Sequence, residues 1–179
     1  MGTQSNPILL ASGALFRIEA ELGGDFMKIR SVGLVNEDVN YGKVLEYVDE
    51  METPPTRFIF DMSAVTRINS CGVREWLLFL QRVEARFQTS FNRANEAFVE
   101  VATSVPGVFG KAGTVVDEIE APFFCAKCNL RTLFYLKSTA CYKGGVIAVP
   151  HQICPKCKGP LEFDGLEEEY FNFLKHIFP

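Results

Sequence analysis

The chain has 179 residues, of which 47% are hydrophobic, and a formal net charge of −4. It is long enough to bury a core and still carry a small second module. No run approaches the ~18 apolar residues of a membrane span, and the first residues lack the charged start and continuous apolar stretch of a signal peptide. These features argue against a membrane or secreted protein, and we expect a soluble, cytoplasmic one.

The first third of the chain predicts two strands and a helix. Residues 13–39 alternate apolar and polar side chains on either side of Gly23-Gly24, which is typical of a strand pair joined by a tight turn. Asn40 is a good N-cap for a helix that reaches about Glu52, before Pro54-Pro55.

A strand, a loop and a second helix follow. Phe58–Phe60 is apolar on both faces, as expected of a central strand. After the turn Asn69–Gly72, apolar side chains recur at helical spacing over residues 73–83. This strand, loop and helix order predicts a βαβ arrangement.

The next part of the chain is less regular. Residues 98–101 predict another strand, and residues 105–112 predict at most a short helix or an ordered loop. Residues 115–119 are expected to lead into the cysteine-containing segment.

Two Cys-x-x-Cys pairs, Cys125/Cys128 and Cys154/Cys157, are separated by 25 residues. Tetrahedral Zn²⁺ needs four soft donors at ~2.3 Å, and two such turns present four sulfurs to one point. Each pair is followed by residues that tolerate positive φ, Asn129 after the first and Lys158-Gly159 after the second. Four thiolates leave no open coordination position, so we predict a structural Zn²⁺ site.

Two disulfides or an iron–sulfur centre are the alternatives for these cysteines. The chain lacks the cysteine density of a secreted disulfide scaffold, and nothing nearby suggests a redox partner. His151 is a possible substitute ligand, although four thiols make a solvated strand residue the better interpretation. Cys71 and Cys141 are left over, and unpaired thiols indicate a reducing compartment.

The residues around and after the cysteine pairs predict a hairpin and a final helix. The β-rich runs 133–136 and 146–149 flank Gly144-Gly145, which favours a hairpin. Asp164 and Glu167 lie at capping-box spacing, and Leu166, Tyr170, Phe173, Leu174 and Ile177 fall along one helical face. We expect this helix to pack back on the body of the protein.

Charge divides the chain into three parts. Residues 1–121 hold 11 Lys/Arg against 17 Asp/Glu, residues 122–161 hold 6 against none, and residues 162–179 hold 1 against 5. We therefore predict a first domain over 1–121, a zinc ribbon over 122–163 and a C-terminal amphipathic helix over 164–179. The positive ribbon can attract nucleic acid, but docking on the acidic first domain of the same chain is favoured.

The stretch 58–80, FIFDMSAVTRINSCGVREWLLFL, resembles the STAS domain of bacterial anti-sigma factor antagonists and of sulfate transporter tails. The resemblance extends more loosely over 13–121. It implies an α/β fold, with a sheet of four or five strands and packed helices, followed here by the small β zinc ribbon and the last helix. It also implies no cofactor in that domain, and docking of a protein partner, anti-sigma-like or another signalling protein, at the loop before the second helix. The residues carried over to that partner-binding loop are Arg67, Asn69, Ser70, Cys71, Gly72 and Arg74.

The loop departs from the family pattern at one position. In the antagonists it reads Asp-Ser-Ser-Gly, with the second serine as phosphate acceptor, whereas here Cys71 stands at that position. Ser70 still offers a hydroxyl at a helix start, where backbone N–H groups and the helix dipole favour a phosphate electrostatically. Modification of Ser70 is therefore a hypothesis of its own. Cys71 is either a redox-sensitive thiol or, as we favour, a small residue that fills a tight turn.

The chemistry-bearing residues do not indicate an enzyme. The two histidines, His151 and His176, have no evident nucleophile partner, and no phosphate loop or dinucleotide fingerprint is present. We expect a non-enzymatic bacterial regulatory or scaffold protein that binds a protein partner. The alternative is a zinc-ribbon nucleic-acid-binding protein, with stacking by Phe134 and Tyr135 and with phosphate contacts from Lys127, Arg131, Lys137, Lys143, Lys156 and Lys158.

Overall fold

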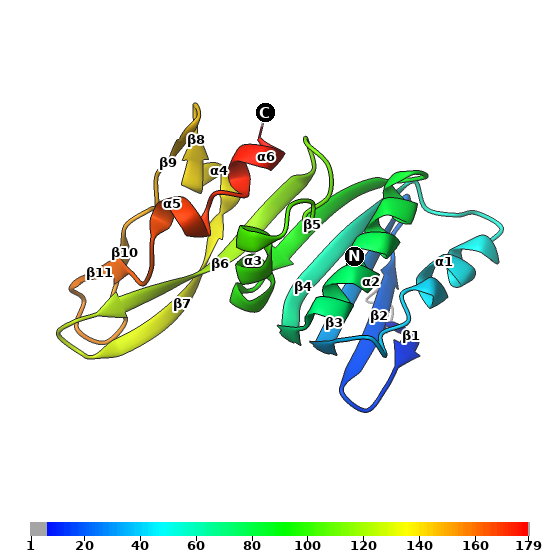
Figure 1. Cartoon of the computed structure of the whole chain (residues 1–179), viewed down its shortest axis with the longest axis horizontal. Coiled ribbons are helices and arrows are strands. Elements are labelled where there is room, and N and C mark those ends of the chain that lie inside the picture. Colours follow the sequence, from blue (N-terminus) through cyan, green and yellow to red (C-terminus); the bar gives the residue numbers. More distant parts are fainter. Residues whose placement is uncertain (1–6, 179) are drawn as a thin grey trace.

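A computed structural model describes residues 7–178 and shows an α/β fold built on a mixed sheet (Figure 1). The strands of its first part are β1 (Ile8–Ser12), β2 (Phe16–Leu22), β3 (Phe26–Val35), β4 (Arg57–Ile68), β5 (Gln88–Ala94) and β6 (Val115–Cys125). The strands of its second part are β7 (Leu130–Lys137), β8 (Tyr142–Lys143), β9 (Val146–Ile147), β10 (Gln152–Ile153) and β11 (Pro160–Phe163).

Nine of these strands form one sheet in the order β1-β2-β3-β4-β5-β6-β11-β10, with β7 paired to β6. Strands β3 to β6 are parallel to one another, whereas β1, β2, β7, β10 and β11 pair antiparallel to their neighbours. The predicted α/β class is confirmed, although six strands precede the cysteine segment instead of four or five. The short pair β8–β9 stands apart from the large sheet.

Six helices are present within residues 7–178: α1 (Gly42–Asp49), α2 (Ser70–Glu84), α3 (Glu96–Ser104), α4 (Ser138–Cys141), α5 (Glu167–Tyr170) and α6 (Leu174–Ile177). The first three connect consecutive parallel strands and lie on one face of the sheet (Figure 1). Asn69 and Asn95 begin α2 and α3 in the same way, because each side chain accepts a hydrogen bond from the third backbone N–H that follows it.

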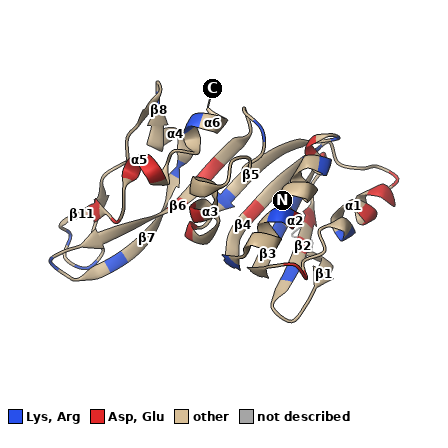
Figure 2. Cartoon of the chain, viewed as in Figure 1, with Lys and Arg blue, Asp and Glu red and all other residues tan. Residues whose placement is uncertain are grey.

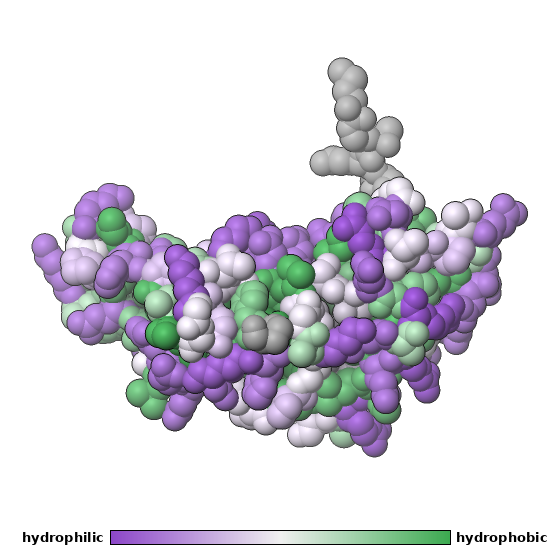
Figure 3. Space-filling view, turned by 90° about the horizontal axis from the view of Figure 1, so that it is seen from above, coloured by the Kyte–Doolittle hydropathy of each residue, from purple (hydrophilic) through white to green (hydrophobic). Residues whose placement is uncertain are grey.

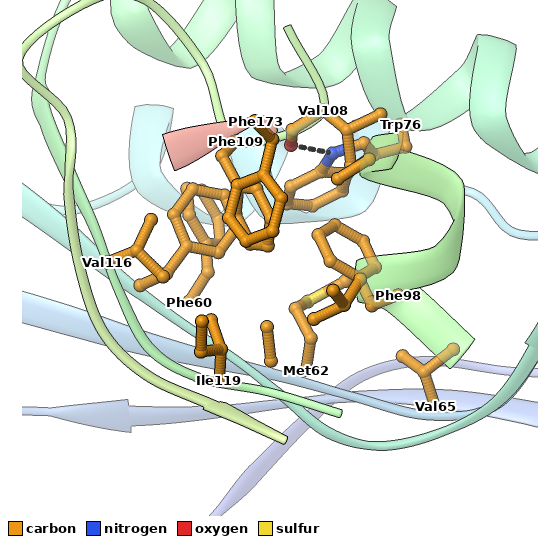
Figure 4. Packing of buried hydrophobic residues seen from close by; sticks show 14 of the residues in the cluster. Phe60, Met62, Val65, Trp76, Phe98, Val108, Phe109, Val116, Ile119 and Phe173 are labelled. Atoms are coloured by element: carbon orange, nitrogen blue, oxygen red, sulfur yellow. Dashed lines mark hydrogen bonds between the residues drawn. The ribbon is translucent and has the colours of Figure 1, made fainter. Parts of the chain in front are cut away.

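The core between helices and sheet is aromatic. Trp76 of α2 is fully buried and contacts Phe60 of the sheet and Phe98 of α3 (Figure 4). It also contacts Phe91 of β5. Its indole Nε1 donates to the Val108 carbonyl at 2.9 Å, so the loop after α3 is held against the core. This bond satisfies the polar atom of an otherwise apolar side chain.

The end of the chain adds to this core. Phe173 packs on Phe109 with ring centroids 4.8 Å apart, and Leu174 and Ile177 are buried beside it. The expected single tail helix is instead two four-residue helices, α5 and α6, because residues 171–173 leave the helical path. Leu166, expected on the packed face, is 66% exposed.

The opposite face of the sheet carries a row of charges. Cross-strand partners in β2 to β7 follow one another as Glu19, Arg30, Asp61, Arg93, Glu118 and Lys137. Within this charge row, ion pairs join Arg30 to Glu19 at 3.7 Å, Arg93 to Glu118 at 2.8 Å and Lys137 to Glu118 at 3.1 Å. Figure 2 shows the acidic and basic residues on neighbouring strands. Oppositely charged cross-strand neighbours stabilise a sheet face that water can reach.

Two other predicted elements are wrong. Residues 98–101 belong to helix α3, where Phe98 and Val99 are buried, and not to a strand. The predicted hairpin between 133–136 and 146–149 does not form, because 133–136 lies in β7, which pairs with β6, while Val146 pairs with Lys143 in β8.

Strand β6 joins the first part of the sheet to the cysteine segment. Its beginning pairs with β5, and its end pairs with β7 on one side and β11 on the other. The expected boundary between residues 121 and 122 falls inside this strand, so the sheet is continuous through it.

Candidate metal centre and partner-binding loop

The four paired cysteines meet at one end of the sheet. Cys125 is the last residue of β6 and Cys128 lies in the turn before β7, while Cys154 and Cys157 lie between β10 and β11. All four Sγ atoms lie within 4.8 Å of one another. The Cys125–Cys157 and Cys128–Cys154 sulfurs are 3.6 and 3.9 Å apart.

These separations fit a metal ion and not a disulfide. A disulfide needs sulfurs about 2.05 Å apart, well below the distances found. Four thiolates bound tetrahedrally at about 2.3 Å lie about 3.8 Å from one another. Cys125 and Cys154 are buried and the other two are half-buried, so the cluster can hold a metal ion with its sulfurs partly shielded from water.

The two cysteine turns have the backbone geometry that the sequence indicated. Asn129 and Lys158 have φ values of 48° and 60°, and no other non-glycine residue of the described chain has a positive φ. Lys158, and not Gly159, takes this conformation after the second pair. The turn is closed by the Lys158 N–H, which donates to the Cys154 carbonyl at 3.0 Å, and by the Cys154 N–H, which donates to the Gly159 carbonyl at 2.9 Å.

The electrostatics of the cluster favour a bound cation. The backbone N–H of Cys157 donates toward the Cys154 sulfur and lowers the pKa of Cys154 to about 6. The neighbouring Cys157 sulfur, with burial, raises the pKa of Cys128 to about 12. Four thiolates therefore do not form together without a positive charge among them, and a metal ion supplies that charge.

Two of the six basic residues expected in the cysteine segment pair with acids of the same chain. Arg131 bridges Glu96 of α3 and Asp164, the second at 2.7 Å. Lys137 contacts Asp117 at 2.9 Å and also Glu118. Both residues connect the segment to the acidic first part of the chain.

The other four basic residues and the two aromatic ones differ in what they can contact. Lys127, Lys143, Lys156 and Lys158 are exposed, and none has an ion-pair partner within residues 7–178. The Tyr135 ring lies under the Arg93 guanidinium, 5.2 Å from its centroid, and Phe134 packs edge-on against Phe123. Arg93 therefore covers one face of the Tyr135 ring, although this side chain is 37% exposed, and Phe134 is half-buried.

The predicted partner-binding loop lies at the carboxyl end of β4. The Asn69 side chain accepts from the Gly72 N–H at 2.7 Å and donates to Glu37 at 3.0 Å, while the Asn69 N–H donates to the Val35 carbonyl at 3.1 Å. These bonds hold the start of α2 against the end of β3. The loop is therefore fixed by caps and backbone contacts.

The loop presents four side chains to solvent. Arg67, Ser70, Cys71 and Arg74 are exposed, and Arg74 pairs with the adjacent Glu75 at 2.8 Å. Gly72 is buried, because α2 approaches β3 so closely that a Cβ would lie 2.2 Å from the Val35 oxygen. Ser70 is the first residue of α2, and Cys71 follows it.

A groove of about 620 Å³ adjoins this loop, between the start of α2 and helix α3. We call it the α2–α3 groove. Its polar rim is formed by Thr66, Arg67, Asn69, Ser70, Glu100 and Ser104. Its apolar floor is formed by Ile68, Val73, Ala97, Val101 and Val105, all half-buried.

The sequence prediction found only the α2 side of this groove. The α3 side was missed because its residues were assigned to a strand and a loop. The available signal was the N-cap Asn95, followed by Ala97, Val101 and Val105 at intervals of four residues.

In the described part of the chain, the face of the molecule seen from above carries no single large apolar surface (Figure 3). From above, hydrophobic residues form small patches separated by hydrophilic ones (Figure 3). No helix of the described residues is long and apolar enough to cross a membrane.

Comparison with known proteins adds no assignment: no protein-family model matches the chain, and no curated protein matches it significantly.

Proposed function

We propose that this chain is a non-enzymatic regulatory or scaffold protein that binds a protein partner through a STAS-like domain, and that its four cysteines hold a structural Zn²⁺. The observation that carries the proposal is the rigid, exposed loop Arg67–Arg74 at the end of β4, beside a groove of about 620 Å³. A loop fixed by caps presents its side chains at a low entropic cost on binding.

The arrangement of the first part of the chain supports the STAS-like assignment. The hairpin β2–β3 is followed by α1, β4, α2, β5, α3 and β6, so a parallel sheet is covered on one face by helices. The loop that resembles the antagonist signature lies between the central strand β4 and helix α2. Its Asn69 caps the helix, a role that aspartate at the same place in the family motif also fits.

The zinc assignment rests on the donor set. Four thiolates with tetrahedral spacing favour Zn²⁺ over harder cations, and the closed set leaves no position for a substrate. Binding of such an ion supplies on the order of 10–16 kcal/mol of apparent free energy, in addition to the apolar contacts of buried residues in the segment such as Phe123, Leu136 and Leu161.

Nucleic-acid binding by the cysteine segment is the alternative function. The four exposed lysines favour it, but Arg131 and Lys137 are already paired with acids. The first part of the chain is also strongly acidic, which repels phosphate at long range. We therefore place the functional surface at the loop.

The test is affinity capture from nuclease-treated native lysate with four versions of the full chain. The wild type is compared with Arg67→Glu in the loop, with Arg82→Glu at the far end of α2, and with Lys127→Glu/Lys156→Glu in the cysteine segment. Arg67 and Arg82 are both exposed, so the second is a matched control for the first.

A stoichiometric protein that is lost only with Arg67→Glu supports the proposed function. Loss of co-purifying material on nuclease treatment, or only in the lysine variant, places function in the cysteine segment. Equal capture by all four chains contradicts both assignments.

A further inference from the structure

The α2–α3 groove has the shape and lining of a site for a narrow apolar segment. Along α3 and its C-cap the floor residues Ala97, Val101 and Val105 recur every four positions and cover about 12 Å at 1.5 Å per residue. Ile68 and Val73 close the opposite side. These five half-buried side chains form a continuous strip about two helical turns long.

The rim of the groove carries one charge of each sign. Arg67 at the end of β4 and Glu100 in the middle of α3 are exposed, and neither has an ion-pair partner among residues 7–178. Most other arginines of the described chain are paired, for example Arg86 with Asp49 at 2.6 Å and Arg93 with Glu118 at 2.8 Å. The free charges on the rim therefore remain available to a bound molecule.

The surroundings do not favour a cofactor or a second copy of the chain. Strands β3 to β6 follow one another without a reversal of order, so the groove is not the switch-point crevice in which α/β sheets hold cofactors. A two-fold axis would pair Arg67 with Glu100 of the second copy, but it would also set one concave floor against another. A convex, amphipathic occupant fills the groove and satisfies both charges.

We propose that the partner inserts an amphipathic helical segment into the α2–α3 groove, with apolar side chains at i, i+4 and i+7 on the floor, an acidic residue facing Arg67 and a basic residue facing Glu100. This inference rests on the proposed function and specifies what the partner must present. It also makes α3 part of the binding surface, together with the loop before α2.

The probe is a displayed library of peptides about 16 residues long, the length at which a helix begins to be stable alone. It is selected against the immobilised full-length protein. Selected peptides are then measured against three variants. Val101→Arg places a charge on the floor, Thr103→Arg is its control on α3 outside the groove, and Arg67→Glu/Glu100→Lys exchanges the two rim charges. Circular dichroism and thermal unfolding confirm that each variant remains folded.

We expect a peptide family with apolar residues at helical spacing and one charge of each sign. It should bind the Thr103→Arg control as it binds the wild type, and at least tenfold more weakly to Val101→Arg. The charge-exchanged variant should prefer peptides with the two charges exchanged.

Equal binding to Val101→Arg, peptides without the charge pattern, or no enriched family would each overturn the inference. A concentration-dependent dimer that Val101→Arg abolishes would overturn it in favour of a second copy. Capture of a lysate protein that depends on Arg67 but not on Val101 would leave the proposed function in place and remove only this inference.

Discussion

The close approach of α2 to β3 makes Gly72→Ala a sharp test of how the proposed partner-binding loop is held. A Cβ at this position would lie 2.2 Å from the Val35 oxygen, 2.6 Å from its carbonyl carbon and 2.9 Å from the Asn36 nitrogen. All three are backbone atoms, so rotation of a side chain cannot relieve the clash. Reaching an ordinary contact of 3.4 Å requires the two segments to separate by about 1.2 Å.

The cost of this movement has three parts. Overpacking costs about 1–3 kcal/mol, and loss of the hydrogen bond from the Asn69 N–H to the Val35 oxygen costs about 1 kcal/mol. Replacing glycine by alanine in a helix returns at most about 1 kcal/mol. We therefore expect a net destabilisation of about 2 kcal/mol, opposite in sign to the effect of helix propensity alone.

Urea unfolding measures this difference. With an m-value of about 2 kcal/mol/M, the midpoint should fall by about 1 M. Gly24→Ala is the control, because nothing lies within 4 Å of its Cβ position, and it should change stability by less than about 0.5 kcal/mol. A Gly72→Ala protein as stable as the wild type would refute the close packing of α2 on β3.

Three further predictions concern the metal centre, the charge row and the loop thiol. Cys154→Ser should reduce bound zinc from one per chain to near zero, and the cysteine segment should become protease-sensitive; zinc retained at one per chain would contradict a four-thiolate site. Burial alone would raise the pKa of Asp61, but hydrogen bonds from Ser63 and the nearby Lys28 ammonium outweigh burial and hold that pKa below its ordinary 3.8. The ionised carboxylate therefore stabilises the fold above about pH 4, and this stabilisation is lost as the pH falls through the folded pKa. Asp61→Asn should therefore lose less stability than the wild type between pH 6 and about pH 3 in thermal unfolding, and equal losses would count against the ion pair. In the zinc-loaded native protein, an alkylating reagent should modify the exposed Cys71 before the buried Cys141, and mass spectrometry that finds the reverse order would show that the loop is not open to solvent.

The cysteine cluster could be predicted from sequence because its information is local. Each Cys-x-x-Cys turn fixes two sulfurs by itself, and the residue after each turn signals the conformation that closes it. The α2 cap at Asn69 has a local signal of the same kind, but the sequence prediction began this helix only at residue 73 and treated Asn69 as part of a turn. A short segment and its immediate neighbours contain everything that these features need.

The features that escaped prediction depend on distant partners. Phe98, Val99 and Val101 form an apolar run too short to separate a strand from a buried helix, and α3 forms because Phe98 and Ala102 face the core together. Strand β7 pairs with β6 and not with the next β-rich run, a choice that sequence spacing does not reveal. Predicting the charge row would require the pairing register of six strands at once. Predicting the groove would require knowing that α2 and α3 lie side by side.

The charge row also determines what can approach that side of the molecule. Its signs alternate from Glu19 to Lys137, so opposite fields cancel within about one Debye length, roughly 8 Å at physiological salt. A charged molecule in solution is therefore neither drawn to this face nor repelled from it. Asp61 is already buried, but covering the row with a further helical layer would strip water from the other five ions at a cost of several kcal/mol for each. The sheet thus keeps one wet side, and any partner is directed to the edges and the helical side instead.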